Sequence, residues 1–301
     1  MKRAALLSLA QVAAFGPWIG IVQAQTEITH IPPVFRPLAL YESQYRLRAG
    51  QRVALAAPEE TLDFIRDARI RTVTIAGPQG KGIVVGPNTE RNGIELAASL
   101  LAEPGEYVVT LSARSGTGEE RATTLAVILD PVQTVPVNSP NPPVVALDGW
   151  QFTCPGSLSG TFGSMADLLH DNGSYQVPVV YFFDNCVECP APDCTIEELG
   201  NVLGQVLGLI KYDNGVLVSQ VDLIAHSMGG LIVRSYLSGK QDTSGVFAPL
   251  SNPRVRKTIF IATPHFGSYQ ADSSLASLDV FAANQLNEMN PGSPFLCVGS
   301  A

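Results

Sequence analysis

The stretch VDLIAHSMGG at residues 221–230 decides the fold of the C-terminal half of this 301-residue chain. Its apolar start, Val221–Ala225, predicts a buried strand, and Gly229–Ser238 predicts a helix. Ser227 stands in the turn between them, with a small residue two positions before it and another two positions after it. Small residues at these places let the backbone pack closely while the serine hydroxyl projects from a sharp turn. The stretch therefore predicts a strand–turn–helix unit that presents Ser227 at the end of a strand.

Strands and helices alternate on both sides of this unit. Apolar runs predict the further strands, and a capping box of Thr195 with Glu198 predicts the start of a long helix. The predicted strands are Val144–Leu147, Val177–Phe183 and Thr258–Ala262, and the predicted helices are Phe162–His170 and Thr195–Tyr212. Because such alternation is typical of parallel sheets with helices on both faces, residues 144–301 are predicted to form an α/β domain.

Residues 25–130 predict a second domain of a different kind. Short runs rich in Val, Ile, Thr and Leu alternate with turn residues, which favours an all-β sandwich. The predicted strands are Arg52–Ala56, Arg71–Ala76, Gly82–Val85, Tyr107–Ala113 and Arg121–Leu129. The run at 104–111, a turn followed by a closing strand, resembles the last hairpin of bacterial immunoglobulin-like modules. No catalytic constellation is evident here, so a spacer or a module that binds an unknown surface or glycan is expected.

Composition limits what the chain can be. It is 46% hydrophobic and 15% charged, which excludes intrinsic disorder. A net charge of −8 argues against nucleic acid or an anionic membrane surface as the main partner. Residues 131–143 contain five prolines and predict a stiff, extended linker between the two domains.

The first 24 residues predict an export signal. Lys2 and Arg3 precede the apolar stretch Ala4–Ala14, and Val22–Ala24 supplies a small-x-small cleavage pattern. An uncleaved membrane anchor is the alternative interpretation. No later segment is apolar for long enough to span a bilayer. We therefore expect a secreted or periplasmic protein with no integral membrane span after signal cleavage.

The motif at 225–230 in its strand–turn–helix context resembles the α/β-hydrolase superfamily, and within it secreted bacterial lipases and esterases. The likeness covers about residues 143–296. It includes LDGWQ at 147–151, where these lipases carry an oxyanion loop, and ATPHFGS at 262–268, which shapes the floor of their site. Asp148 stands where the family has a histidine, which leaves the geometry of the oxyanion loop open.

The resemblance implies an acyl-transfer enzyme. Ser227 would be the nucleophile, and the backbone N–H groups of Met228 and Trp150 would stabilise the oxyanion. Carboxylic esters, including those of lipids, would be the substrates, with an acyl-serine intermediate and no metal or organic cofactor. An acyltransferase on the same fold stays open. The alternative from another class is a non-catalytic extracellular binding protein with a truncated or decayed hydrolase domain.

The acid and the base of a catalytic triad are not evident. In this superfamily both follow the serine, yet no histidine follows His265. His226 adjoins Ser227, and its side chain is expected to point away at a tight turn. Two explanations compete: the chain is truncated within the domain, or His265 has been recruited as the base with Asp272 or another acid behind it.

Five cysteines in an exported chain favour disulfides over a zinc site. If the strand order of the family holds, the strands ending near Leu147 and Asp184 are neighbours. Cys154 and Cys186 would then lie on adjacent loops and could form a disulfide. Cys189 and Cys194 could close a short local loop, which leaves Cys297 as a free thiol.

Overall fold

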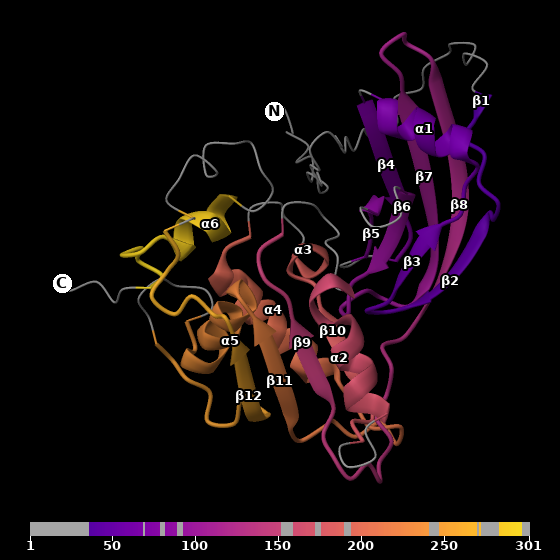
Figure 1. Ribbon diagram of the computed structural model, residues 1–301. Helices are drawn as coiled ribbons and strands as arrows, with labels where there is room; N and C mark the ends of the chain where they lie inside the picture. The colour runs from indigo at the N-terminus through magenta and orange to yellow at the C-terminus, as the bar shows by residue number, and fades with distance from the viewer. Residues whose placement is uncertain are drawn as a thin grey trace, which may run out of the picture.

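The computed structural model separates an N-terminal group of strands from a C-terminal group of strands and helices (Figure 1). It describes residues 36–68, 70–78, 82–88, 93–151, 159–171, 176–189, 194–240, 247–269, 271 and 283–296. The predicted export signal, Cys154, Asp272 and Cys297 lie outside these residues.

The C-terminal half is built on a four-stranded sheet. Its order is β10-β9-β11-β12, and all three pairings are parallel. The strands are β9 (Val144–Leu147), β10 (Val180–Phe183), β11 (Val221–His226) and β12 (Val255–Ile261). β9 is buried along its whole length, whereas β12 lies at an edge of the described sheet with partly exposed side chains. The predicted parallel sheet, with β9 and β10 as neighbours, is confirmed.

Helices cover both faces of this sheet. Val145, Leu147 and Leu223 point to a core shared with α4 (Ile196–Leu209) and α5 (Met228–Ser238). Val144, Ala146 and Ile224 point to the opposite side, where they pack with Phe162 of α2 (Ser159–Asp171). Two short helices, α3 (Asn185–Glu188) and α6 (Ala283–Met289), lie beyond the strand ends (Figure 1). The predicted α/β layering follows from this alternation of side-chain direction.

Local signals set the ends of the two long helices. The hydroxyl of Thr195 accepts from the backbone N–H of Glu198 at 3.0 Å, and the Glu198 carboxylate accepts from the N–H of Thr195 at 2.8 Å. This is the predicted capping box. α4 ends at Leu209 rather than Tyr212, because Tyr212 bridges in strand fashion to Val135. α5 ends at Gly239, whose positive φ of 70° suits glycine.

The N-terminal half contains two sheets around one apolar core. The five-stranded sheet contains β1 (Arg36–Pro37), β2 (Gln44–Arg48), β4 (Ile70–Ala76), β7 (Gly105–Arg114) and β8 (Glu120–Asp130). The three-stranded sheet contains β3 (Arg52–Leu55), β5 (Ile83–Asn88) and β6 (Gly93–Ala98). The sequence had not predicted β1, β2 or β6. The likeness to immunoglobulin modules stays a prediction.

One helix interrupts these strands, contrary to the all-β prediction. α1 (Glu59–Asp67) follows Pro58, and its two glutamates lie in the first turn. Acidic residues there are favoured by the helix dipole. Thr61 and Ile65, one turn apart, are buried against the strands. The short length of α1, with only these two buried positions, leaves little periodic signal in the sequence.

The proline-rich segment packs against the C-terminal half. Val135 is fully buried, its N–H donates to the carbonyl of Lys211, and its carbonyl accepts from the N–H of Asp213, both at 2.9 Å. The hydroxyl of Tyr181 on β10 donates to the carbonyl of Gln133 at 2.6 Å. Residues 133–135 are therefore held by the neighbouring half, although the composition predicts an extended spacer.

The described residues contain neither a candidate membrane span nor a candidate metal site. No helix there is long and apolar enough to cross a bilayer. No group of three or more His, Cys, Asp or Glu side chains there could hold a metal ion.

Candidate active site

Ser227 occupies a strained turn between β11 and α5. Its backbone has φ 51° and ψ −125°, a conformation that L residues other than glycine rarely adopt. The turn is held on one side by the Ser227 N–H, which donates to the carbonyl of Ile261 on β12 at 2.8 Å. On the other side α5 begins at Met228, which is fully buried. The surrounding elements therefore fix the strained conformation that presents the hydroxyl.

Small residues surround this turn because there is no space for larger ones. A Cβ atom on Gly229 would lie 2.6 Å from the carbonyl oxygen of Asp148 and 2.7 Å from that of Leu147. A Cβ atom on Gly149 would lie 2.8 Å from the Cβ of Ser227 itself. Ala225, two residues before the serine, is fully buried. The close approach of β9 and β11 thus requires the small residues that the sequence shows.

The loop after β9 lies against Ser227 and is folded by Asp148. One carboxylate oxygen of Asp148 accepts from the backbone N–H of Gly149 at 2.6 Å, and the other accepts from the hydroxyl of Thr161 on α2 at 3.1 Å. Asp148 is only 7% exposed. The residue that departs from the family pattern therefore organises the loop that contains Trp150.

His226 turns towards this loop. Its Nδ1 lies 3.3 Å from a carboxylate oxygen of Asp148. The half-buried imidazole lies beside Gly149, which the side chain of Ser227 also approaches. Among the described residues no hydrogen bond joins His226 to Ser227.

His265 lies on the segment that follows β12. Its ring meets the edge of Phe260 with a centroid separation of 5.1 Å, and its Nδ1 lies 3.4 Å from the guanidinium of Arg234. Burial, and then the charge on Arg234, lowers the pKa of His265 below its usual value of 6.5. Within the described residues neither a carboxylate nor Ser227 is hydrogen-bonded to this ring. The predicted acid Asp272 lies outside them.

Three polar side chains at this site were not predicted. Asn185 donates to the carbonyl of Gly149 at 3.1 Å, and Gln151 donates to the carboxylate of Asp184 at 3.0 Å. Asp184 also caps α3 by accepting from the N–H of Cys186. Their signal in the sequence is their position, since polar residues directly after a buried strand lie at the carboxyl edge of a parallel sheet.

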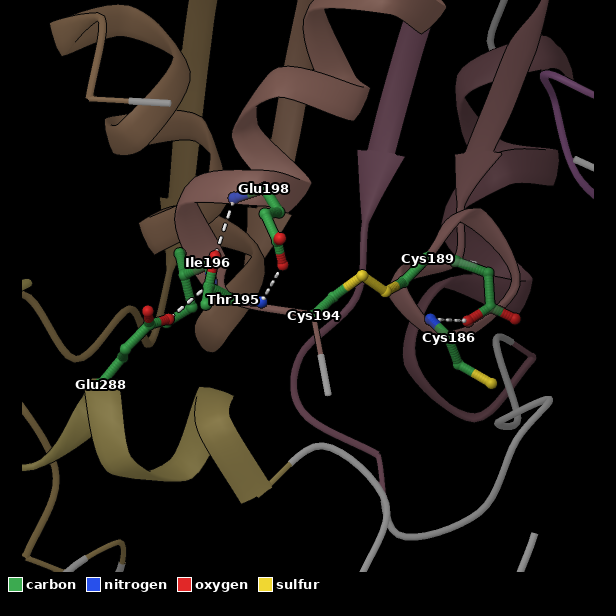
Figure 2. Close-up of a disulfide and its surroundings, with 8 residues drawn as sticks. Cys186, Cys189, Cys194, Thr195, Ile196, Glu198 and Glu288 are labelled. Carbon is green, nitrogen blue, oxygen red and sulfur yellow. Dashed lines mark hydrogen bonds between the residues drawn. A yellow bond between two sulfur atoms is a disulfide. The ribbon is translucent and has the colours of Figure 1, made fainter. Parts of the chain in front are cut away.

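A disulfide joins the C-cap of α3 to the residue that directly precedes the N-cap of α4. Cys189 and Cys194 are bonded, with their Cα atoms 6.1 Å apart, as the local-loop prediction proposed. Figure 2 shows this disulfide beside Thr195 and Glu288, whose carboxylate accepts from the N–H of Ile196 at 2.5 Å. Cys186 is also a disulfide cysteine. Cys154, its predicted partner, is not among the described residues.

A protein-family model matches the stretch of chain that contains this turn. The family model of lecithin:cholesterol acyltransferase matches residues 198–291, which run from α4 through Ser227 to α6. The parallel sheet, the strained turn at Ser227 and this family match all indicate the same fold. The C-terminal half has a lipase-like α/β-hydrolase fold. The match covers less than half of the chain, so it describes this half alone.

The solved structures that resemble this chain are distant from it. A Bacillus licheniformis lipase, BlEst2 in its propeptide form, is 24% identical with a TM-score of 0.37, and the alignment covers 54% of this chain and 33% of the lipase. This chain thus spans a third of that lipase. A Bacteroides ovatus protein of a mixed-linkage glucan utilization locus, SGBP-B, solved with a heptasaccharide, is 17% identical with a TM-score of 0.19, covering 40% and 29% of the two chains. No curated protein matches the chain.

Proposed function

We propose that this protein hydrolyses carboxylic esters, including those of lipids, through an acyl-Ser227 intermediate. The single observation that supports this most strongly is the strained turn at Ser227 between a buried parallel strand and a helix. The match to an acyltransferase family over the same residues agrees with it. With the predicted signal at residues 1–24, we propose that the activity is exported.

In this proposal the turn at Ser227 and the loop after β9 both contribute catalytic groups. The hydroxyl of Ser227 attacks the ester carbonyl, and the backbone N–H groups of Met228 and Trp150 donate to the oxyanion that forms. Donors fixed in place before the reaction stabilise this charge without reorganisation. The N-terminus of α5 behind Ser227 adds a favourable dipole. The Gly149 contact with Ser227 supports this role, because it brings the loop against the serine.

We propose His265 as the base that accepts the proton of Ser227. Its lowered pKa keeps the imidazole neutral at neutral pH, and the neutral form is the one that accepts a proton. Direct contact with Ser227 is absent among the described residues, so the proposed proton transfer needs a water relay or a rearrangement of the segment that contains His265.

Hydrolysis of a short p-nitrophenyl ester tests the proposed function. We expect turnover by the full chain and at least about a thousandfold loss in Ser227→Ala, the scale at which nucleophile removal acts. Ser238→Ala, a serine at the other end of α5, is the matched control and should retain turnover. Equal rates in the parent and Ser227→Ala would contradict the proposal.

Transfer of the acyl group to an alcohol is a second candidate, favoured by the acyltransferase family match. The same acyl-serine serves both reactions, and the acceptor is selected by the pocket. Adding a long-chain alcohol to the ester assay distinguishes them. A new ester product at the expense of free acid would identify a transferase, whereas free acid alone would identify a hydrolase.

A further inference from the structure

The N-terminal strands and the loop of Trp150 meet at one short segment, the turn from Asp184 into α3. Figure 1 shows α3 on the side of the C-terminal half that faces the N-terminal strands. From the N-terminal side, Arg52 on β3 donates to one carboxylate oxygen of Asp184 and also to Glu95 on β6 at 3.2 Å. From the other side, Gln151 donates to the second oxygen of Asp184 at 3.0 Å. One carboxylate therefore connects a strand of the N-terminal half to the residue that follows Trp150.

A second contact fixes the same segment. Glu188 at the end of α3 is 1% exposed, and its carboxylate accepts from the hydroxyl of Ser99 and from the N–H of Leu100, both at 2.7 Å. Leu100 packs in the apolar core of the C-terminal half, and Cys186 packs in that of the N-terminal half. Because each half places a side chain in the core of the other, sliding at this contact would open cavities.

The turn from Asp184 into α3 also restrains the loop that lies against Ser227. Asn185, which follows Asp184, donates to the carbonyl of Gly149 at 3.1 Å. Gly149 in turn lies against the side chain of Ser227. The loop that contains Trp150 is thus held at both ends by the turn into α3: at Gly149 through Asn185, and at Gln151 through Asp184.

Charge makes this arrangement sensitive to Arg52. The carboxylate of Asp184 is 3% exposed, and a buried carboxylate is tolerated only when a cation and hydrogen bonds compensate it. Arg52 is the cation that contacts it, with its side chain 19% exposed. Without Arg52, Asp184 would turn towards water or other donors. Gln151 shares that carboxylate and would move with it.

We propose that Arg52 is a positioning residue for ester hydrolysis, acting through Asp184 and Gln151 to hold the oxyanion donor of Trp150 in place. The N-terminal half is then a working part of the hydrolase and not only a spacer or binding module. This inference rests on the proposed function, since it assigns Arg52 to the proposed oxyanion loop.

The loop has a built-in spectroscopic reporter. The chain contains two tryptophans, and Trp18 lies within the predicted export signal, so removal of that signal, or Trp18→Phe where it is retained, leaves Trp150 as the only one. In this background we would compare the full-length parent with Arg52→Gln, Arg52→Lys and Arg46→Gln. Arg46→Gln is the matched control, because it breaks an ion pair with Asp130 in the same half without touching α3. The readouts are acrylamide quenching of Trp150, kcat and KM for a soluble ester, and the unfolding temperature.

We expect Arg52→Gln to increase the quenching of Trp150 and to lower kcat about tenfold or more with KM little changed, the scale for a misplaced oxyanion donor. Arg52→Lys keeps the cation and should recover part of both effects, and Arg46→Gln should match the parent. Should Arg52→Gln fail to fold, Arg52→Lys decides, with the same signs and smaller changes.

Quenching and kcat that equal those of Arg46→Gln would overturn the inference. So would a loss of kcat with unchanged quenching of Trp150. If the parent itself hydrolyses no ester, the proposed function fails, and quenching alone then decides whether Arg52 positions the loop.

Discussion

The two halves of the molecule differ in how they use buried polar side chains. Among the described residues, the N-terminal half buries only Thr61 and Ser99, while the other buried polar side chains belong to the C-terminal half. The N-terminal strands alternate between buried and exposed positions, whereas β9 and β11 are buried almost throughout. The first half is an ordinary layered core, and the second places four of its buried polar side chains directly after the parallel strands β9 and β10.

This difference indicates where a reactive site can lie and how the N-terminal half contributes to it. Buried polar groups are costly unless they are hydrogen-bonded. Four of them, Asp148, Gln151, Asp184 and Asn185, follow β9 and β10 directly and are linked by hydrogen bonds beside the loop of Trp150, which marks a site rather than an ordinary core. Of the two buried polar side chains in the N-terminal half, Ser99 donates to Glu188 on α3. Ser99 therefore lies where the two halves meet.

The largest expected effect concerns the base. We expect His265→Asn to slow acylation of Ser227 about a thousandfold, the range for loss of a positioned base. In the parent the rate should rise with pH as the base loses its proton, and the midpoint of the rise should lie below pH 6.5, because the pKa of His265 is lowered. Stopped-flow ester hydrolysis from pH 4.5 to 8 measures both. An unchanged rate and pH profile in His265→Asn would assign activation to another group.

A somewhat smaller effect is expected at the contact of the loop with the serine. Gly149→Ala places a methyl group 2.8 Å from the Cβ of Ser227, so the loop must move, and kcat should fall about a hundredfold. Gly208→Ala on the exposed face of α4 is the control, because nothing lies within 4 Å of the added Cβ. That control should keep kcat and stabilise the fold by about 0.5–1 kcal/mol. Equal kcat in both variants would show that the position of this loop does not affect the reaction.

The disulfide should contribute to stability in the C-terminal half alone. Cys189→Ser with Cys194→Ser opens a loop with a sequence separation of 5, and the chain-entropy scale gives a loss of about 2 kcal/mol. Urea unfolding followed by a probe in each half measures this. A loss of the same size in both halves would mean that they unfold as one unit, which would weaken the contrast between them.

The last prediction concerns the buried carboxyl pair of Glu288 on α6 and Glu197 on α4. Burial, and then a hydrogen bond with Glu197, raises the pKa of Glu288 to about 9, while Lys240 lies 3.7 Å from Glu197. The folded state thus keeps a proton that the unfolded state releases above about pH 4.5. The free energy of unfolding should therefore fall with rising pH up to about 9, by at most about 1.4 kcal/mol per unit.

Glu288→Gln cannot titrate and should weaken this pH dependence. Urea unfolding at pH 6 and pH 8 compares it with the parent and with Glu42→Gln, an exposed control. We expect the slope to decrease only in Glu288→Gln. A parallel pH dependence in all three proteins would show that Glu288 has an ordinary pKa.

The features that the sequence predicted correctly depend on residues that lie close together along the chain. The turn at Ser227 and the capping box of Thr195 depend on residues within a few positions, and both are present as expected. The contact of Arg52 with Asp184 joins residues 132 positions apart and has no local pattern. The contact of His226 with Asp148 likewise joins residues 78 positions apart at the ends of neighbouring strands and has no local pattern.

Labelling with a fluorophosphonate probe, followed by peptide mapping, tests the central claim most directly. The probe reacts with an activated serine whatever the natural substrate is. We predict one adduct on the peptide that contains Ser227, absent in Ser227→Ala and present in Ser238→Ala. A folded parent chain that takes up no label, or a label that persists in Ser227→Ala, would contradict the account and favour a non-catalytic binding protein or a different nucleophile.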